Sequence, residues 1–583
     1  MVLRSRWMPN KEEVTAREGL VTAMQPQCAE AGLKMLKLGG NAIDAGVAMG
    51  FCNIVVEPYM AGLAGLGFML IYLSEEDRTV AIDFNTRAPR KATPDMYSVI
   101  GPAPAGANTI FEVENDETQI GAKAVTVPAT CAGFCLAHEL YGSLPLEKVM
   151  EPSVNLASEG FHANWHVTLW LANNMRWIQQ IPAIAEMWLP GGRCPRSFPE
   201  PGDKIVQLNL GRLLRRISTE GPDAMYRGEV AKAVEDEVLK GGGILSKEDL
   251  EEYEPLVSEP LSVAYRDYTI MAVPTPSGGP TVLETLNILE DFDLQSLGHN
   301  TSEYLDLFVE CARHAFADRF RYLGDWEVAE VPIEGLLSKG YAKEIAGQVD
   351  LKEGDLKKGL VEEPWVFYLE RALHDPWRYD PRPRPSMPYG AASSPSDRES
   401  TTHFNVVDRD RNVVSCTHTG SFRPGVIPLG TGLYLVGGMS WFIAKAGYAN
   451  SVAGWKRPLV NMAPLMVLKD GVPVLSVGSP GARKIINRNT QVVLNVLEFG
   501  MGIQEAIAAL TVDASGRRTL LDSRLPTDVV GRLKEKRHQV DVVEEQPGMT
   551  GNFARPSGIL LDYETGLLHG GVDVFRPAIA LGL

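Results

Sequence analysis

The spacing of apolar positions along the chain predicts a helical first part that opens with alternating short elements. These are a strand, a helix, a glycine stop and a second helix, over residues 20–23, 28–38, 39–41 and from 42 onward. A strand then follows the glycine-rich stretch 62–67, and another covers 80–84 before the polar turn 85–89. Residues 130–370 show mainly helical spacing, with stop signals at Gly192, Gly221 and 241–243. One of these helices, 281–290, is preceded by the turn-rich loop 273–280.

The pattern changes at a polar segment that ends near residue 400. Residues 375–400 are rich in proline, arginine and serine, and such a stretch buries too little apolar surface to offset its ordering entropy, so we predict an exposed tether. Beyond it the apolar positions alternate, which predicts strands at 402–407, 413–419 and 465–475 with turns at 408–412 and 469–471. A helix-rich part, a tether and a strand-rich part predict stacked helix and sheet layers, with the tether ending at a cleft.

The junction between tether and first strand carries the candidate chemistry. If the bond between Ser400 and Thr401 is cut, Thr401 becomes a new N-terminus whose free amine lies beside its own hydroxyl. An α-amine has an unperturbed pKa near 8 and can take the proton of that poor nucleophile directly or through water. Such a site needs no histidine. By itself, however, a pair of threonines at the start of a strand usually reflects only the preference of β-branched residues for strands.

Composition narrows the class of protein. The chain has 583 residues and a net charge of −17, which argues against nucleic acid or an anionic membrane as partner. The N-terminus lacks a signal-peptide pattern and no uncharged run is long enough to span a bilayer, so we expect a cytoplasmic protein. The seven cysteines are scattered, and Cys131 and Cys135 lack the further ligands of a zinc site, so reduced thiols and no metal are expected. His314, on a predicted helix, is expected to be a hydrogen-bonded structural residue.

Taken together, several motifs resemble the γ-glutamyltranspeptidase family of N-terminal-nucleophile hydrolases, including its cephalosporin-acylase-like branch. The similarity covers nearly the whole chain and rests on segments 39–45, 56–58, 91–97, 121–128, 286–290, 401–408, 430–432, 456–458 and 478–481. It implies an α+β fold, a four-layer αββα sandwich, and a precursor that cuts itself before Thr401. The large subunit would be 1–400, including the tether 375–400, and the small subunit 401–583, together forming one globular domain and possibly a further homo-oligomer.

The resemblance also implies roles for individual residues. Thr401 would attack an amide to form an acyl-enzyme, the hydroxyl of Thr419 would assist it, and the backbone N–H groups of Gly481 and Ala482 would form the oxyanion hole. Preorganised donors of this kind typically contribute roughly 3 kcal/mol each. Alanine replaces the family's second glycine at 482, but a backbone donor survives that change. No metal or organic cofactor is implied, and the partner would be a small-molecule amide.

Departures from the family pattern concern the substrate. The family holds the α-carboxylate of a γ-glutamyl group with an arginine and its α-amine with an acidic side chain. The corresponding positions here are Asn85 and Trp441, and other substrate-binding positions are occupied by Gly438, Val460, Asn461 and Ser421. A desolvated ammonium without a carboxylate loses several kcal/mol, of which a tryptophan face returns only about 1 to 2.

These observations leave three hypotheses. The first is a self-processing amidohydrolase or acylase whose acyl group is not γ-glutamyl and is instead carboxylate-bearing or hydrophobic. The second is a true γ-glutamyltransferase or glutathione hydrolase in which Arg87 or Arg423 replaces the missing arginine, although surface ion pairing is the alternative role for both. The third is a non-catalytic binding or scaffold protein that retains the fold, for which a Thr401→Ala change would have no effect.

Overall fold

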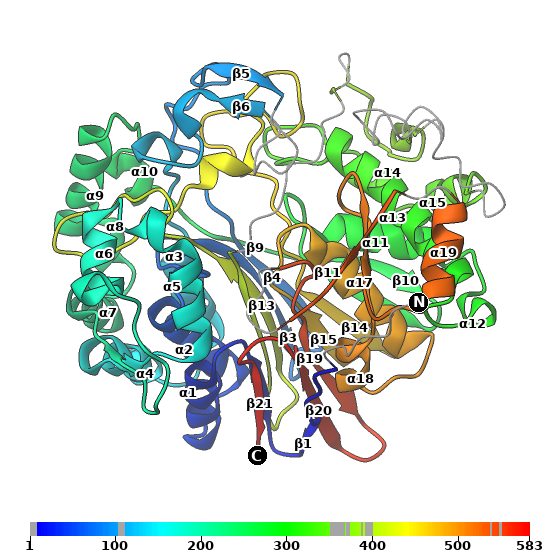
Figure 1. Cartoon of the computed structure of the whole chain (residues 1–583), viewed down its shortest axis with the longest axis horizontal. Coiled ribbons are helices and arrows are strands. Elements are labelled where there is room, and N and C mark those ends of the chain that lie inside the picture. Colours follow the sequence, from blue (N-terminus) through cyan, green and yellow to red (C-terminus); the bar gives the residue numbers. More distant parts are fainter. Residues whose placement is uncertain are drawn as a thin grey trace.

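The fold is described from a computed structural model, which describes residues 8–102, 111–349, 368, 374–385, 389–390, 400–536, 539–546 and 551–583. Of the predicted tether, residues 386–388 and 391–399 lie outside the described part. Figure 1 shows two large sheets in the middle of the molecule with helices on the outer face of each.

Each large sheet has seven strands, and all neighbours within each are antiparallel. The first has the order β21 (Ile579–Gly582), β2 (Leu20–Ala23), β12 (Thr402–Val407), β13 (Val413–Thr419), β3 (Leu66–Leu73), β4 (Arg78–Phe84) and β9 (Leu256–Ser258). The second has the order β1 (Val14–Ala16), β20 (Leu567–Val572), β19 (Ser557–Asp562), β15 (Val472–Gly478), β14 (Leu465–Lys469), β11 (Tyr268–Ala272) and β10 (Leu261–Tyr265).

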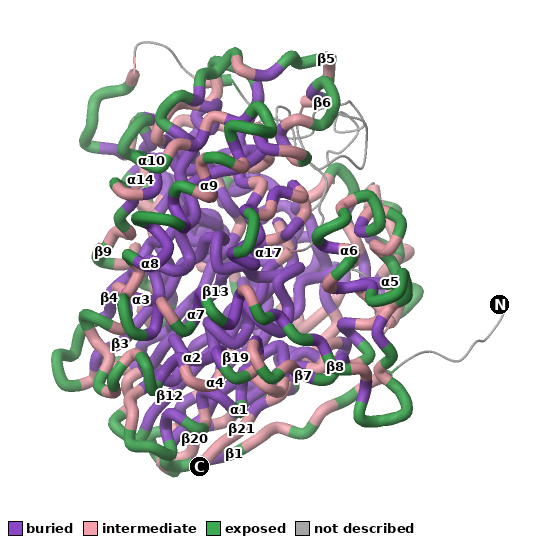
Figure 2. The backbone as a smooth tube through the Cα atoms, turned by 90° about the vertical axis from the view of Figure 1, so that its left-hand side faces the viewer, coloured by how far each residue is buried: buried purple, intermediate pink, exposed green. Residues whose placement is uncertain are grey.

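Helices cover the outer face of each sheet. The first sheet packs against α1 (Pro26–Lys37), α2 (Ala42–Val56) and α3 (Thr130–Tyr141), and the second against α11 (Gly279–Leu289), α17 (Lys484–Leu497) and α18 (Ile503–Ala508), with α13 (Ser302–Tyr322) outside α11. This arrangement is the four-layer αββα sandwich that the family resemblance implies, and it contains the stacked helix and sheet layers that the sequence pattern predicts. Strands β3, β12 and β13 are buried at every position (Figure 2). Accordingly β3 is a nearly continuous apolar run, whereas β12 and β13 carry buried polar side chains among their apolar ones.

Smaller elements extend both halves. Further helices are α4 (Leu146–Glu159), α5 (Trp165–Ile178), α6 (Pro182–Trp188), α7 (Leu208–Glu220), α8 (Asp223–Tyr226), α9 (Gly228–Lys240), α10 (Lys247–Glu251), α12 (Leu294–Leu297), α14 (Ile333–Leu336), α15 (Lys339–Ala346) and α19 (Thr527–Glu535). Short strands are β5 (Val99–Pro102), β6 (Phe111–Val113), β7 (Phe161–His162), β8 (Lys204–Ile205), β16 (Val512–Asp513), β17 (Thr519–Asp522) and β18 (Val540–Val543). The 3-10 turns include η2 (Ala122–Ala124), η4 (Pro376–Arg378) and η5 (Gly438–Trp441).

Most predicted elements are confirmed, including the mainly helical character of the described part of 130–370, but the strands within that stretch were not predicted. The strands before residue 90 and the two hairpins after residue 400 lie where the apolar spacing places them. The stretch 130–370, however, is not helical throughout, because β9, β10 and β11 interrupt it at residues 256–272. The β10–β11 hairpin turns at Arg266, which has a φ of +52°. The local alternation and the two-residue turn carried this signal, but the surrounding helical spacing outweighed it.

The remaining predictions concern the cysteines, His314 and membrane-spanning helices. All seven cysteines are free; six are buried and Cys194 is half-buried. The ring of His314 is buried and its Nδ1 lies 2.9 Å from Nε2 of His374, in keeping with the predicted structural role. Within the described ranges, no helix combines the length and the apolar character needed to cross a membrane.

Candidate active site

The two central strands of the first sheet bring the predicted nucleophile and its predicted assistant together. In the β12–β13 hairpin Thr402 pairs with His418, so the next step in register sets Thr401 opposite Thr419. Their hydroxyl oxygens are 3.3 Å apart, and both residues are buried. The hydroxyl of Thr401 lies 2.5 Å from the carbonyl oxygen of Ser400, and the hydroxyl of Thr419 donates to the same oxygen. Two hydroxyls therefore converge on the carbonyl of the predicted scissile bond.

Alternation along β12 separates the side chains that follow Thr401. Thr402 and Phe404 face the helices outside the first sheet, whereas His403 and Asn405 face the second sheet. Burial lowers the pKa of His403 to about 3, and its two ring nitrogens pair with Thr417 at 2.8 Å and Asn405 at 3.1 Å. A neutral ring with both nitrogens engaged is a structural group of the strand, and no base function is assigned to it.

The predicted oxyanion hole follows strand β15. This strand ends at Gly478, whose Cα packs against the ring of His403, so the next residues lie beside the start of β12. Gly481 has a φ of +144° and a side chain there would collide with Ala554, so only glycine fits. Ala482 has a φ of +54°, a left-handed conformation unfavourable for a residue with a Cβ. Within the described part of the chain, neither backbone N–H makes a hydrogen bond, so both remain available.

The position that corresponds to the family's arginine holds a buried, neutral side chain. Asn85 donates from Nδ2 to the carbonyl of Pro458 at 2.9 Å, and its Oδ1 has no partner among the described residues. Asp83, two residues earlier, is paired with the buried guanidinium of Arg457, which also binds Asp325. The guanidinium of Arg457 is thus a positive charge near Asn85, but the carboxylates of Asp83 and Asp325 compensate it.

Arg87 is held in a structural role. Its guanidinium forms an ion pair with Glu327 at 2.8 Å and donates to the carbonyl of Trp455 at 2.8 Å. The side chain is only 9% exposed. To bind a substrate carboxylate, Arg87 would have to release Glu327, so this geometry weighs against its use as a substitute for the missing arginine.

Gly438 and Trp441 lie at the two ends of η5, which packs on the turn around Ala88 through a shared apolar cluster. A side chain at Gly438 would collide with Thr126, which accounts for the absence of a longer residue there. Trp441 is half-buried, and its carbonyl accepts a hydrogen bond from Asn450 at 2.7 Å. The position predicted to correspond to the family's acidic residue thus holds a half-buried aromatic side chain and no carboxylate.

Val460 and Asn461 are tied to an arginine that the sequence analysis left without a role. Arg319 on α13 donates to the carbonyl of Val460 at 2.8 Å and to Oδ1 of Asn461 at 2.9 Å. Burial, together with the nearby charge of Arg483, lowers the pKa of Arg319 to about 9. The helical spacing predicted α13. The sequence alone, however, did not indicate that Arg319 contacts Asn461, which lies 142 residues further along the chain.

The loop after β13 carries Ser421 and Arg423. The Ser421 hydroxyl accepts a hydrogen bond from the backbone N–H of Arg423 at 3.2 Å, and the Arg423 guanidinium makes no hydrogen bond or ion pair with any described residue. Between them, Phe422 is buried in a group of aromatic side chains that sequence reasoning missed. Its neighbours are Trp170, Trp177, Trp188 and Tyr434. The density of tryptophan over 165–188 was the signal available in the sequence.

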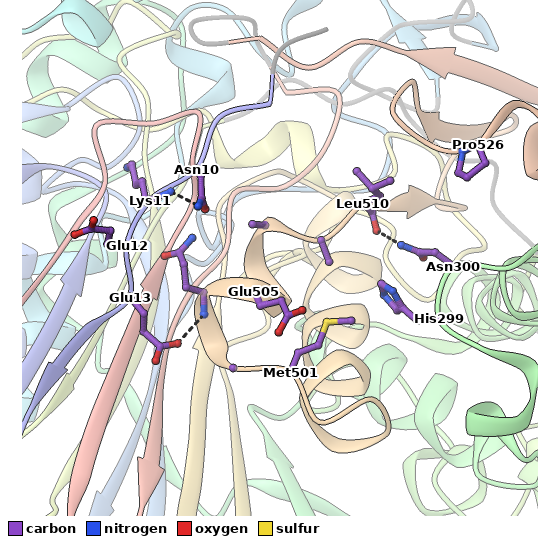
Figure 3. A pocket seen from close by; sticks show the side chains of 14 residues that line it. Asn10, Lys11, Glu12, Glu13, His299, Asn300, Met501, Glu505, Leu510 and Pro526 are labelled. Carbon is purple, nitrogen blue, oxygen red and sulfur yellow. Dashed lines mark hydrogen bonds between the residues drawn. The ribbon is translucent and has the colours of Figure 1, made fainter.

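A separate cavity lies away from all of these residues. It has a volume of about 920 Å³ and lies between the N-terminal segment, His299 and α18, with Lys11, Glu13 and Glu505 on its walls (Figure 3). None of the predicted site residues lines it. Among the described residues, no group of three or more His, Cys, Asp or Glu side chains could hold a metal ion.

Comparison with known proteins places this geometry in a family. The model of the Gamma-glutamyltranspeptidase family matches residues 28–580. The chain is 34% identical to a glutathione hydrolase proenzyme of Escherichia coli (strain K12), over 85% of this chain and 81% of that protein. It is also 34% identical to the acylase ACY 1 proenzyme of Pseudomonas sp. (strain SE83), over 91% of this chain and 88% of that protein.

Solved structures agree in fold. The crystal structure of cephalosporin acylase from Bacillus halodurans superposes with a TM-score of 0.83 over 100% of this chain and 99% of that chain, at 24% identity. That identity supports the fold alone. With the family model spanning nearly the whole length, this chain is an enzyme of the γ-glutamyltranspeptidase family and has the N-terminal-nucleophile hydrolase fold.

Proposed function

We propose that the protein is a self-processing amide hydrolase or acylase in which Thr401 is the nucleophile. The observation that carries this proposal is the convergence of the Thr401 and Thr419 hydroxyls on the carbonyl oxygen of Ser400. Cleavage would divide the chain into 1–400 and 401–583, and the pairing of β12 with β2 would keep the two pieces in one sheet.

Self-cleavage begins with attack of the Thr401 hydroxyl oxygen on the carbonyl carbon of Ser400. The hydroxyl of Thr419, which already donates to the Ser400 oxygen, stabilises the negative charge that develops there. The C–N bond breaks, an ester forms to Thr401 Oγ, and the hydroxyl proton goes to the departing nitrogen. Water then hydrolyses the ester, leaving a carboxylate on Ser400 and a free amine and hydroxyl on Thr401.

The same groups then act on an external amide. The α-amine of Thr401 takes the hydroxyl proton as the oxygen attacks the substrate carbonyl, and the N–H groups of Gly481 and Ala482 receive the oxyanion. The amine product leaves with that proton, and water releases the acid from the acyl-enzyme. These steps use only groups of the chain, water and substrate.

We further propose that the acyl group is not γ-glutamyl. Asn85 presents a neutral amide where a carboxylate would need a cation, and Arg87 is already paired with Glu327. Trp441 offers an aromatic face where an ammonium would need a carboxylate. The aromatic group around Phe422, which follows Thr419 by three residues, favours an apolar part in the substrate.

A true γ-glutamyltransferase or glutathione hydrolase is the second candidate. Two observations favour it: the relative of Escherichia coli bears the name glutathione hydrolase proenzyme, and the guanidinium of Arg423 makes no interaction with a described residue. In that case Arg423, two residues after Ser421, would bind the α-carboxylate in place of the family's arginine.

Intact-mass spectrometry of the purified protein beside Thr401→Ala tests the proposal. Two fragments meeting at Ser400 and Thr401, present only in the unmodified chain, support the nucleophile. A single 63.7 kDa species in both proteins refutes self-processing and favours a binding or scaffold role.

The cleaved enzyme is then assayed with γ-glutamyl-p-nitroanilide and with p-nitroanilides of glutaryl and phenylacetyl groups. Preference for the γ-glutamyl substrate, lost in Arg423→Ala and kept in Arg87→Ala, would favour the second candidate.

A further inference from the structure

A buried polar cluster lies on the helix side of the strand that carries the nucleophile. Glu57, directly after α2, is 1% exposed, and its Oε2 accepts a hydrogen bond from Nε2 of Gln25 at 3.1 Å. Its other oxygen, Oε1, has no hydrogen-bond partner among the described residues. The hydroxyl of Thr402 is fully buried and is likewise without a partner in the described part of the chain. The packing of α2 on β12 brings the two groups to the same place: Asn53, one helical turn before Glu57, lies 3.4 Å from the ring of His418, which pairs with Thr402 in register.

The two groups are close enough to influence each other. Burial raises the pKa of Glu57 to about 7, and three neighbours oppose that rise: the hydroxyl of Thr402, the amide of Gln25 and the charge of Arg576. An unpaired buried hydroxyl or carboxylate oxygen costs free energy, so the ionised carboxylate and the hydroxyl gain by pairing with each other.

Several elements contribute the surroundings of Glu57. The guanidinium of Arg576 contacts the ring of His166 on α5, and burial together with that charge holds the pKa of His166 well below its ordinary value. The hydroxyl of Tyr59 lies 3.3 Å from the other ring nitrogen of His166. The titratable and charged groups that face Glu57 are Cys28 from α1, Tyr59, His166 and, near the C-terminus, Arg576. Of these, Arg576 supplies the positive charge.

We propose that Glu57 is a positioning residue for Thr401: its ionised carboxylate binds the Thr402 hydroxyl and fixes the first residue of β12, with Arg576 as counter-charge. The inference rests on the proposed self-cleavage at Thr401. Because successive side chains of a strand point to opposite faces, Glu57 holds Thr402 from the helix side while the hydroxyl of Thr401 lies against Thr419. A small rotation of residue 402 would move the Thr401 hydroxyl away from the Ser400 carbonyl, and such misplacement is costly for an attack at close range.

Self-cleavage of the precursor isolates this effect. Before cleavage Thr401 has no free α-amine, so that amine cannot contribute to the pH dependence. Burial lowers the pKa of His403 and of His418 to about 3, outside the range of interest. We therefore expect the rate of self-cleavage to rise with pH and to reach half its plateau near pH 7. One ionisation centred there gives about a tenfold difference between pH 6 and pH 8.

The experiment uses full-length chain made by cell-free synthesis with labelled methionine and then transferred to buffers from pH 5.5 to 8.5. Gel analysis over time gives the rate of appearance of the fragments 1–400 and 401–583. Four chains are compared: the unmodified protein, Glu57→Gln, Thr402→Val and, as the matched control that keeps the hydroxyl, Thr402→Ser.

The proposal predicts a pH profile for each variant. Glu57→Gln should cleave at the low, acid-limit rate at every pH, with no midpoint. Thr402→Val, which removes the hydroxyl that Glu57 binds, should likewise cleave at the low rate with no midpoint, whereas Thr402→Ser should keep the midpoint of the unmodified protein.

Unchanged midpoints in both Glu57→Gln and Thr402→Val would overturn the inference and leave the proposed function standing. If Glu57→Gln is not cut at all, the pH profile of Thr402→Val decides: loss of the midpoint supports the inference and an unchanged midpoint refutes it. An unmodified chain that stays whole at every pH refutes self-cleavage itself and, with it, this role of Glu57.

Discussion

Replacing Glu57 by glutamine should make the protein less sensitive to alkaline pH, although it removes a charge from the cluster at the nucleophile. The folded chain raises the pKa of this carboxyl from 4.5 to about 7, so the folded state binds the proton more tightly than the unfolded state does. Below pH 4.5 both states are protonated and the group has no effect. As the pH rises from 4.5 to 7, stability is lost, because the unfolded chain ionises first.

The size of this loss follows from the difference in pKa. One pH unit corresponds to 1.36 kcal/mol, so a difference of roughly 2.5 units costs about 3 kcal/mol of unfolding free energy once the pH exceeds 7. Glutamine keeps the shape of the side chain and never ionises. The difference in unfolding free energy between Glu57→Gln and the parent should therefore move by about 3 kcal/mol in favour of the variant between pH 4.5 and pH 8.

Urea denaturation followed by fluorescence measures this difference. Both proteins carry Thr401→Ala so that neither is cleaved, and Glu75→Gln, an exposed position in the β3–β4 turn, serves as the control for losing one carboxylate. A difference between Glu57→Gln and parent that stays constant from pH 4.5 to pH 8 would refute the assignment of a raised pKa to Glu57. The proposed positioning of Thr401 by Glu57 would then have no group that titrates near pH 7.

Three further predictions concern groups around the same site. Thr419→Val removes the donor to the Ser400 carbonyl and should slow self-cleavage by about a hundredfold, measured as the rate of fragment formation; an unchanged rate would exclude Thr419 from the reaction. Ala482→Gly should raise the stability of the uncleaved chain by about 1 kcal/mol in urea denaturation, because it relieves a φ of +54°, and a lower midpoint would contradict the strain argument. Arg457→Met leaves the buried carboxylate of Asp325 uncompensated and should lower the free energy of unfolding, measured by urea denaturation, by about 3 to 5 kcal/mol. A decrease of less than about 1 kcal/mol would refute the argument that Arg457 compensates this buried charge.

Local patterns in the sequence predicted the parts of this site that depend on local structure. Alternation and a polar turn predicted the β12–β13 hairpin, and the hairpin register alone sets Thr401 opposite Thr419. The tether before Thr401 marked the same position. The hairpin of β10 and β11 had an equally local signal and was missed because helical spacing dominates on both sides of it.

Contacts between distant segments were beyond a reading of the sequence. Glu57 belongs to segment 56–58, one of those that resemble the family. It lies 345 residues before Thr402 in the chain, so its proximity to Thr402 depends on how α2 crosses the sheet. The pairing of Arg87 with Glu327 likewise joins positions 240 residues apart. Periodicity describes which face of an element is buried, and it contains no information on which polar groups meet there.

The layout of the proposed site would allow substrate recognition to change while the residues proposed for nucleophilic attack stay the same. Strand register sets Thr401 opposite Thr419, and the proposed oxyanion donors at Gly481 and Ala482 belong to the backbone. The positions predicted to bind substrate lie in turns and loops, at 85–87, 421–423, 438–441 and 460–461. A substitution in these loops leaves the register of β12 and β13 unchanged. With Trp441 where the family has an acidic side chain, an ammonium would lose several kcal/mol and regain only about 1 to 2, so the proposed selection against a zwitterionic acyl group requires no change at Thr401.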